Sequence, residues 1–189
     1  MNNLRARIKE KRKQLSDESL KLLGNDILKN IHGLISFEDH EKISTYFSVN
    51  NEADTSNLNN YLWDINKDLF LPKIKQGRLL FSSYSKDQKF SLNDYGIPEP
   101  EHIDEKLIEA EKFDLMFIPL VAFDTECNRI GMGGGYYDKT LAFKKESENK
   151  NKPLLIGLAY EFQKIEAIEK NAWDIPMDAI ITEDRTYTV

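Results

Sequence analysis

The chain has 189 residues, of which 40% are hydrophobic and 31% charged, and these values suit one globular domain spanning residues 1–189. A net charge of −6 argues against a general nucleic-acid-binding or membrane-binding protein. The single cysteine, Cys127, excludes an intrachain disulfide, and its neighbours Glu126 and Asn128 predict an exposed turn with a poorly nucleophilic thiol. Because no segment has the features of a signal peptide or a membrane span, we expect a cytoplasmic protein. We also expect it to be a monomer.

Apolar residues recur at three- and four-residue steps near the N-terminus, which predicts helices with one apolar face. They are Leu4, Ile8, Leu20, Leu23, Ile27 and Ile31. Ser16 followed by Asp17 is an N-cap signal, so we expect two helices that meet near Ser16. The basic residues of the first helix are interpreted, on composition, as a solvated face: Arg5, Arg7, Lys9, Lys11, Arg12 and Lys13.

Segments typical of strands alternate with helical segments along the rest of the chain. We expect strands at 43–49, 69–72, 79–81, 113–119, 154–159 and 179–182, helices at 55–63 and 136–145, and a loop at 94–100. The nearly all-apolar run at 113–119 suits a parallel strand that is covered on both faces. The order of elements predicts an α/β fold: a three-layer α/β/α sandwich with a largely parallel central sheet, Rossmann-like but without a dinucleotide fingerprint.

Four of the nine glycines fall between Gly131 and Gly135, ahead of the predicted helix at 136–145. Glycine lets the backbone turn tightly and approach a ligand, and a helix N-terminus favours an anion, so we predict a phosphate-binding loop. A tight connection without a ligand is the alternative. Neither common phosphate motif fits, because a Walker sequence is absent and Tyr136 replaces the last glycine of the dinucleotide motif.

The residues after the glycines suggest what else this loop could bind. Tyr136 and Tyr137 can offer a flat face to a fused aromatic ring. Asp138 could lie near a Mg²⁺ ion that bridges phosphates. The alternatives are helix packing for the tyrosines and an ordinary first-turn acid for Asp138.

The segment from Phe123 to Leu141, with Gly131-Met132-Gly133-Gly134-Gly135-Tyr136-Tyr137-Asp138 at its centre, resembles the signature of the 5-formyltetrahydrofolate cyclo-ligase family. The resemblance extends over essentially the whole chain. Further matching segments follow in the family's order at 4–5, 47–52, 71–73, 95–100, 173–174 and 178–182.

The resemblance implies an ATP- and Mg²⁺-dependent enzyme that converts 5-formyltetrahydrofolate to 5,10-methenyltetrahydrofolate and releases ADP and phosphate. Transfer of the γ-phosphoryl group to the formyl oxygen would make that oxygen a leaving group. Nitrogen 10 would then attack the activated carbon and close the ring. Such a protein must mainly align two substrates and neutralise charge.

The resemblance also implies roles for particular residues. The ATP-binding residues would be Arg5, Arg129, Ile130, Gly131, Met132, Gly133, Gly134, Gly135, Tyr136 and Tyr137. Glu52 would hydrogen-bond the pterin, Phe47 and Tyr137 would pack on the folate, and Lys73 would contact phosphate or folate. The carboxylates that hold Mg²⁺ would be those of Asp138 and Asp174.

Two other classes of function stay open at this point. A sugar-phosphate isomerase or acyl-CoA transferase on a related α/β fold could use Glu52 as base or nucleophile and would need no ATP. A non-catalytic protein could bind folate or nucleotide without turnover. ATP-dependent product formation separates the enzyme implied by the resemblance from both.

Overall fold

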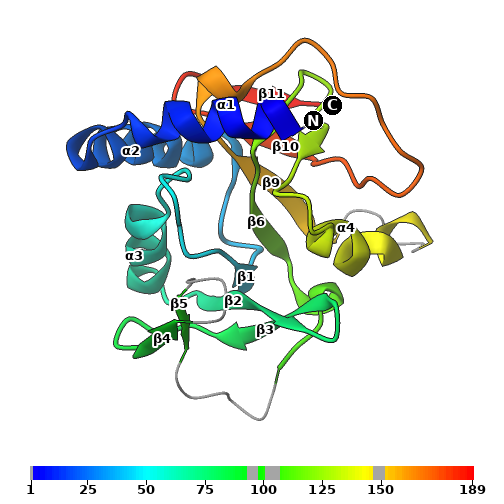
Figure 1. Ribbon diagram of the computed structural model, residues 1–189. Helices are drawn as coiled ribbons and strands as arrows, with labels where there is room; N and C mark the ends of the chain where they lie inside the picture. The colour runs from blue at the N-terminus through cyan, green and yellow to red at the C-terminus, as the bar shows by residue number, and fades with distance from the viewer. Residues whose placement is uncertain (1, 93–97, 101–106, 147–151) are drawn as a thin grey trace.

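The structure is a computed structural model that describes residues 2–92, 98–100, 107–146 and 152–189. Its central sheet has the strand order β11-β10-β9-β6-β1-β2-β3 (Figure 1). The strands are β1 (Lys42–Ser44), β2 (Asp68–Lys75), β3 (Arg78–Ser83), β6 (Leu115–Pro119), β9 (Leu154–Leu158), β10 (Ala179–Ile181) and β11 (Thr186–Thr188). Neighbouring strands from β10 to β2 are parallel, and β3 and β11 are antiparallel edges. The expected largely parallel sheet is confirmed.

Both faces of the sheet are covered, as expected for a three-layer sandwich. The helices α2 (Asp17–Leu34) and α3 (Ser56–Asp64) pack on one face through Ile27, Ile31, Leu58 and Leu62. The short helix α4 (Tyr136–Leu141) and the 3-10 turn η1 (Ala110–Lys112) lie in the cluster on the opposite face. Side chains alternate along each strand, so β6 contributes to both clusters and its apolar run is explained.

The N-terminal region forms two helices that meet where the sequence predicts. Helix α1 (Asn2–Lys13) is followed by Ser16, whose hydroxyl accepts a hydrogen bond from the Ser19 amide at 3.2 Å and caps α2. This bond satisfies one of the free N–H groups at the start of α2. No helix within the described ranges is both long enough and apolar enough to cross a membrane.

Three predicted elements differ in kind or in length from those observed, beyond shifts of a few residues at the ends of the others. The strand expected at 43–49 ends at Ser44 in β1, and the helix expected at 136–145 is α4 followed by the 3-10 turn η2 (Ala142–Lys145). In the loop expected at 94–100, β5 (Pro98–Pro100) instead pairs with β4 (Phe90–Leu92), whereas residues 94–97 lie outside the described residues.

The early end of β1 has a physical cause in the residues that follow it. The hydroxyls of Tyr46 and Ser48 donate hydrogen bonds to the carbonyl oxygen of Ala53, at 2.8 and 3.0 Å. Asn50 and Asn51 adopt left-handed backbone conformations with φ of 51° and 55°, which asparagine tolerates better than most residues. The chain therefore turns back on itself after β1 instead of continuing as a strand.

Cys127 corrects a prediction, because it lies in a turn but is fully buried. The turn joins β7 (Ala122–Phe123) to β8 (Arg129–Ile130), and the thiol donates a hydrogen bond to the Tyr187 carbonyl at 3.4 Å. Burial raises the pKa of Cys127 to about 11. The thiol is thus protonated at neutral pH and is a poor nucleophile, and burial is the largest cause.

The order of the strands creates a switch point between β1 and β6. From β1 the chain passes through α3 to β2 on one side, and from β6 it passes through α4 to β9 on the other. In open α/β sheets, ligands bind in the crevice beyond the carboxyl ends of two such strands. We use the word crevice for the space beyond the carboxyl ends of β1 and β6. The segments after these two strands both contact Arg12 of α1, and α1 lies across the same end of the sheet (Figure 1).

We expect Gly157→Ala to lower the free energy of unfolding by about 1–3 kcal/mol, the usual cost of overpacking a core. Gly157 lies in β9, and an added Cβ would lie 2.8 Å from Leu120 Cδ2 and 3.1 Å from Ile180 Cγ1. Urea denaturation would measure the loss. Gly33→Ala is the matched control, since no described atom lies within 4 Å of its added Cβ. Equal stability of the two variants would contradict the packing argument.

Candidate active site

The glycine loop leaves the β7–β8 hairpin and enters α4. Gly133 and Gly135 have φ of 111° and 64°, conformations that side chains with a Cβ rarely adopt. At Gly134, an added Cβ would lie 2.6 Å from the Tyr136 ring. Three of the loop's glycines are therefore required by conformation or by space. The loop follows a short hairpin strand, not a strand of the central sheet.

Arg5, for which the resemblance implied a contact with ATP, joins α1 to this loop. Its Nε donates a hydrogen bond to the Gly131 carbonyl oxygen at 2.9 Å, across 126 residues of sequence. Its guanidinium also lies 3.7–3.9 Å from the position that a Cβ on Gly133 would take. The loop backbone and an N-terminal cation are thus brought together.

A second cation, Arg129, lies beneath the loop and is paired with Asp138. The two side chains are 2.7 Å apart and 4% and 21% exposed, respectively. Burial lowers the pKa of Arg129, and Asp138 opposes that shift. The Asp138 carboxylate also accepts a hydrogen bond from the Ile175 amide at 3.3 Å. In this structure Asp138 therefore holds Arg129 in place.

Asp174 lies near this pair, because it precedes Ile175 and its charge acts on Arg129. Its carboxylate accepts hydrogen bonds from the Asn171 amide and side chain, at 2.8 and 3.1 Å. The described residues contain no group of three or more His, Cys, Asp and Glu side chains that could enclose a metal. Mg²⁺ usually binds one or two carboxylates together with phosphate oxygens and water, so Asp138 and Asp174 would be enough protein ligands for it.

Glu52 occupies the other side of the crevice, after β1. Its side chain is buried, 3.8 Å from Arg12, and accepts a hydrogen bond from the Val49 amide at 3.3 Å. Burial raises the pKa of Glu52, whereas Arg12 acts to lower it. The Tyr160 hydroxyl donates to the Glu52 carbonyl at 3.0 Å, so the backbone that carries the carboxylate is fastened to the end of β9.

Tyr137 connects the two sides of the crevice. Its hydroxyl is buried and has no hydrogen-bond partner among the described residues. Burial raises the pKa of Tyr137, Arg129 opposes that shift, and the charge of Glu52 adds to it. The Arg129 guanidinium lies 5.7 Å from the centre of the Tyr137 ring. The phenol therefore lies beside the cation of the loop and is acted on by the charge of the buried carboxylate.

The remaining predicted residues lie around this centre with different degrees of exposure. Phe47 is 37% exposed and its ring packs against Phe90 of β4 at 5.5 Å. Lys73 lies on β2, three residues beyond Phe70, which pairs with Ser44 at the end of β1. It therefore belongs to the same end of the sheet as Glu52. Ile130 is buried and Met132 is half exposed.

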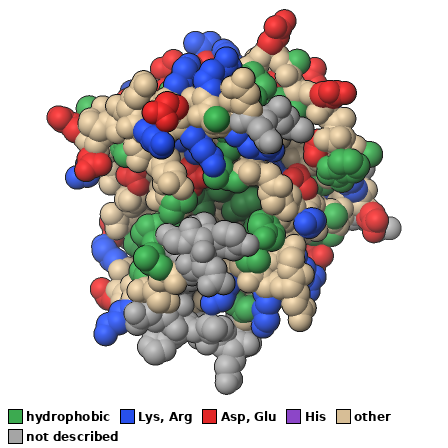
Figure 2. Space-filling model, viewed as in Figure 1, with side chains coloured by type: hydrophobic (Ala, Val, Ile, Leu, Met, Phe, Trp, Pro, Cys, Tyr) green, Lys and Arg blue, Asp and Glu red, His purple; other side chains and the backbone are tan. Residues whose placement is uncertain are grey.

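Arg12 is a site residue that the sequence interpretation missed. Expected on a solvated face, it is 1% exposed, and its guanidinium donates to the Leu120 carbonyl as well as facing Glu52. Its spacing along α1 was a sequence signal of this burial. Arg12 follows Ile8 by four residues and therefore shares the buried face of α1. The basic residues exposed on α1 form part of the cationic surface above the central hydrophobic patch in Figure 2.

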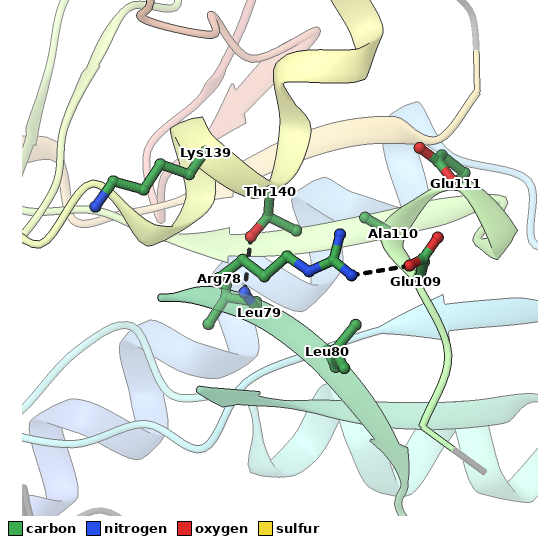
Figure 3. A pocket seen from close by; sticks show the side chains of 8 residues that line it. All are labelled: Arg78, Leu79, Leu80, Glu109, Ala110, Glu111, Lys139 and Thr140. Carbon is green, nitrogen blue, oxygen red and sulfur yellow. Dashed lines mark hydrogen bonds and ion pairs between the residues drawn. The ribbon is translucent and has the colours of Figure 1, made fainter. Parts of the chain in front are cut away.

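Contacts behind α4 fasten the glycine loop to the sheet (Figure 3). The Thr140 hydroxyl accepts a hydrogen bond from the Leu79 amide at 2.8 Å, and Arg78 pairs with Glu109 at 3.1 Å beside it. These residues line a hollow of about 40 Å³, which is far below the roughly 300 Å³ of a small-molecule site. We assign this region a supporting role.

A model of the 5-formyltetrahydrofolate cyclo-ligase family matches residues 1–183. The chain belongs to this family. The 5-formyltetrahydrofolate cyclo-ligase of Haemophilus influenzae is 33% identical over 186 residues, which cover 91% of this chain and 97% of that one. The corresponding Escherichia coli K12 protein is 29% identical and covers 95% and 98% of the two chains. The family expected from the glycine loop, and with it the cyclo-ligase class of enzyme, is confirmed.

The fold is shared with solved structures of cyclo-ligases. The NMR structure of Aquifex aeolicus 5,10-methenyltetrahydrofolate synthetase superimposes with a TM-score of 0.81 at 30% identity, over 99% of this chain and 91% of that one. The Mycoplasma pneumoniae synthetase gives a TM-score of 0.75 at 24% identity, over 96% and 98%. These matches confirm the α/β fold class.

Proposed function

We propose that this chain converts 5-formyltetrahydrofolate to 5,10-methenyltetrahydrofolate, with ATP as co-substrate and Mg²⁺ as cofactor. Family membership supports the reaction. One structural observation supports the site. The Tyr137 ring lies 5.7 Å from the guanidinium of Arg129, its buried hydroxyl has no hydrogen-bond partner in the described residues, and the charge of the buried carboxylate Glu52 acts on it. A nucleotide on the loop and a folate against Glu52 would therefore have their reacting ends side by side.

On the nucleotide side, the protein's contribution is positive charge held in a fixed place. Arg5 and Arg129 are anchored to Gly131 and Asp138, so they need not reorganise when a triphosphate binds. Preorganised donors of this kind stabilise charge that develops during phosphoryl transfer. Mg²⁺, held by Asp138 and Asp174, would supply further neutralisation of the phosphate charge.

On the folate side, Glu52 would accept hydrogen bonds from pterin N–H groups, and the rings of Phe47 and Tyr137 would form apolar walls. Lys73, at the same end of the sheet, would attract a carboxylate or phosphate. A buried carboxylate that must meet N–H donors rejects molecules that lack them, because it would otherwise stay unpaired. This gives the crevice a physical basis for choosing a pterin.

In the proposed reaction the formyl oxygen attacks the γ-phosphorus and the bond to ADP breaks. Nitrogen 10 then attacks the formyl carbon and loses its proton, and the carbon–oxygen bond breaks as phosphate leaves. The protein's residues hold the two substrates in line and exclude water from the activated carbon. Such alignment is a large part of catalysis in reactions of this type.

The test is the appearance of the methenyl product, which absorbs in the near ultraviolet. Purified protein would be mixed with 5-formyltetrahydrofolate and Mg-ATP, with parallel samples lacking ATP or containing a chelator. We expect product and ADP in equal amounts in the complete mixture alone. Tight binding of both ligands without ADP release would contradict the proposed turnover, and product without ATP would point to a different chemistry.

The single domain, the monomeric state and the cytoplasmic location stay predictions. Size-exclusion chromatography with light scattering would test the monomer, for which the expected mass is 22.0 kDa. A dimer under assay conditions would contradict it. Cell fractionation would test the location.

We expect Tyr137→Phe to weaken folate or nucleotide binding by about tenfold while leaving the free energy of unfolding unchanged or slightly higher. The lost hydroxyl is buried without a partner in the described residues, so its removal relieves an unsatisfied group in the free protein. Isothermal titration and urea denaturation would measure the two quantities. Loss of stability with unchanged binding would show that the hydroxyl serves the fold.

A further inference from the structure

Arg12 joins the ends of the two strands that border the crevice. Glu52 lies in the segment after β1, and Leu120 directly follows β6. One terminal nitrogen of the Arg12 guanidinium lies 3.8 Å from the Glu52 carboxylate. The other donates a hydrogen bond to the Leu120 carbonyl oxygen. Because β1 and β6 flank the switch point, this side chain lies where the topology predicts a ligand.

The surroundings of Arg12 hold it in one position. Asn51, next to Glu52, donates through its side chain to the Arg12 and Leu15 carbonyls at 2.9 and 3.2 Å. Leu120 is held in turn by the Gln163 side chain, which donates to its carbonyl at 2.9 Å. Glu52 therefore faces a cation whose place is set by neighbouring hydrogen bonds. The Nε of Arg12 is buried and without a partner in the described residues.

The other groups around Glu52 supply little compensating charge. Lys9 of α1 acts on Glu52 more weakly than Arg12 does. The charge of Glu52 also acts on Tyr46, from the segment after β1, and on Tyr137 of α4, and burial raises the pKa of both phenols, so they are neutral near pH 7. A carboxylate buried to this degree is expensive to ionise unless a cation is adjacent. Among these groups, Arg12 supplies most of the positive charge that acts on Glu52.

We propose that Arg12 is a positioning residue of the cyclo-ligase reaction, which keeps Glu52 ionised and directed into the crevice so that it can accept hydrogen bonds from the pterin. The proposal rests on the proposed function. Arg12 acts through Glu52 and makes no contact with the reacting atoms. A purely structural role, in which Arg12 only fastens α1 to the sheet, is the competing explanation.

The test compares Arg12→Met, which removes the charge but keeps much of the length, with Arg12→Lys, which keeps the charge. Lys13→Met is the matched control, because Lys13 is exposed and pairs only with exposed Glu10 on the same helix among the described residues. The readouts are the pH dependence of kcat/KM for 5-formyltetrahydrofolate and the KM for ATP. The wild-type protein and each variant would be measured from pH 5 to 9.

We expect the acidic limb of the Arg12→Met profile to move up by about 1–2 pH units, because loss of an adjacent cation makes Glu52 easier to protonate. Activity would fall by about tenfold or more at the pH of the wild-type limb and recover as the pH rises. Arg12→Lys would restore most of the limb, and Lys13→Met would not move it. The KM for ATP would stay near the wild-type value in all three variants. An equal loss at every pH, or an unmoved limb, would overturn the proposal.

A double variant keeps the proposal testable if Arg12→Met fails to fold. In the double variant Arg12→Met with Glu52→Gln, no buried carboxylate is left that needs a neighbouring cation. We therefore expect this variant to fold and its pH profile of kcat/KM to lack the shifted acidic limb. Failure of this double variant to fold, when Glu52→Gln alone folds, would overturn the proposal in favour of packing. If wild-type protein binds 5-formyltetrahydrofolate without turning it over, the proposed function fails. The same pH comparison, made on binding of that folate, would then decide the role of Arg12 separately.

Discussion

Asp138→Asn is expected to lower kcat by about 10²-fold or more, because the proposed Mg²⁺ loses a carboxylate ligand and Arg129 loses the partner that holds its positive charge in place. The structure adds a second effect. Asp138 is the partner of Arg129, whose side chain is 4% exposed, so the variant leaves a buried cation without its counter-charge. We expect the free energy of unfolding to fall by roughly 1–3 kcal/mol. The absorbance assay and urea denaturation would measure the two effects.

Asp26→Asn is the matched control, since Asp26 is an exposed acidic residue of α2 and belongs neither to the glycine loop nor to α4. It should change neither quantity. Titration of activity with Mg²⁺ separates the two roles of Asp138. A higher Mg²⁺ requirement in Asp138→Asn would support the metal role. Wild-type activity in Asp138→Asn at low Mg²⁺ would remove Asp138 from that role, whatever happens to stability.

Glu52→Gln is expected to lower kcat/KM for 5-formyltetrahydrofolate by about 10²-fold, mainly through KM, because an amide replaces the carboxylate that accepts the pterin N–H groups. Arg5 and the glycine loop are not changed, so the KM for ATP should stay near the wild-type value. Steady-state kinetics with each substrate varied in turn would measure this. An equal rise in both KM values would contradict the assignment of Glu52 to the folate side.

The same variant carries a pH prediction for stability. Burial raises the pKa of Glu52 in the folded chain above its unfolded value of about 4.3. Between these two pKa values the folded state binds more protons, so its free energy of unfolding falls as the pH rises through that window. Glu52→Gln should lack this part of the pH dependence, as measured by urea denaturation from pH 4 to 7. Glu166→Gln, at an exposed position, should keep it.

The sequence by itself predicted most of the regular elements and the family. Buried parallel strands such as β6 and β9 reveal themselves as apolar runs, and Ser16 marks a helix start through its own side chain. The glycine loop was recognisable because glycine is needed locally, at φ values such as the 111° of Gly133. Signals of this kind depend on neighbours in sequence, so a sequence pattern contains them.

The tertiary structure decided which side chains meet. The segment 45–49 has the composition of a strand, but hydrogen bonds from Tyr46 and Ser48 to Ala53 turn the chain back and bring Glu52 into the crevice. The spacing of Arg12 from Ile8 was compatible with a buried position, but only the tertiary structure shows the partners that make burial of its charge possible, Glu52 and the Leu120 carbonyl. The pairing of Asp138 with Arg129 added a stability role to an acid predicted for metal. Each of these depends on where distant segments fold, as in the contact of Arg5 with Gly131 across 126 residues, and no local periodicity encodes that.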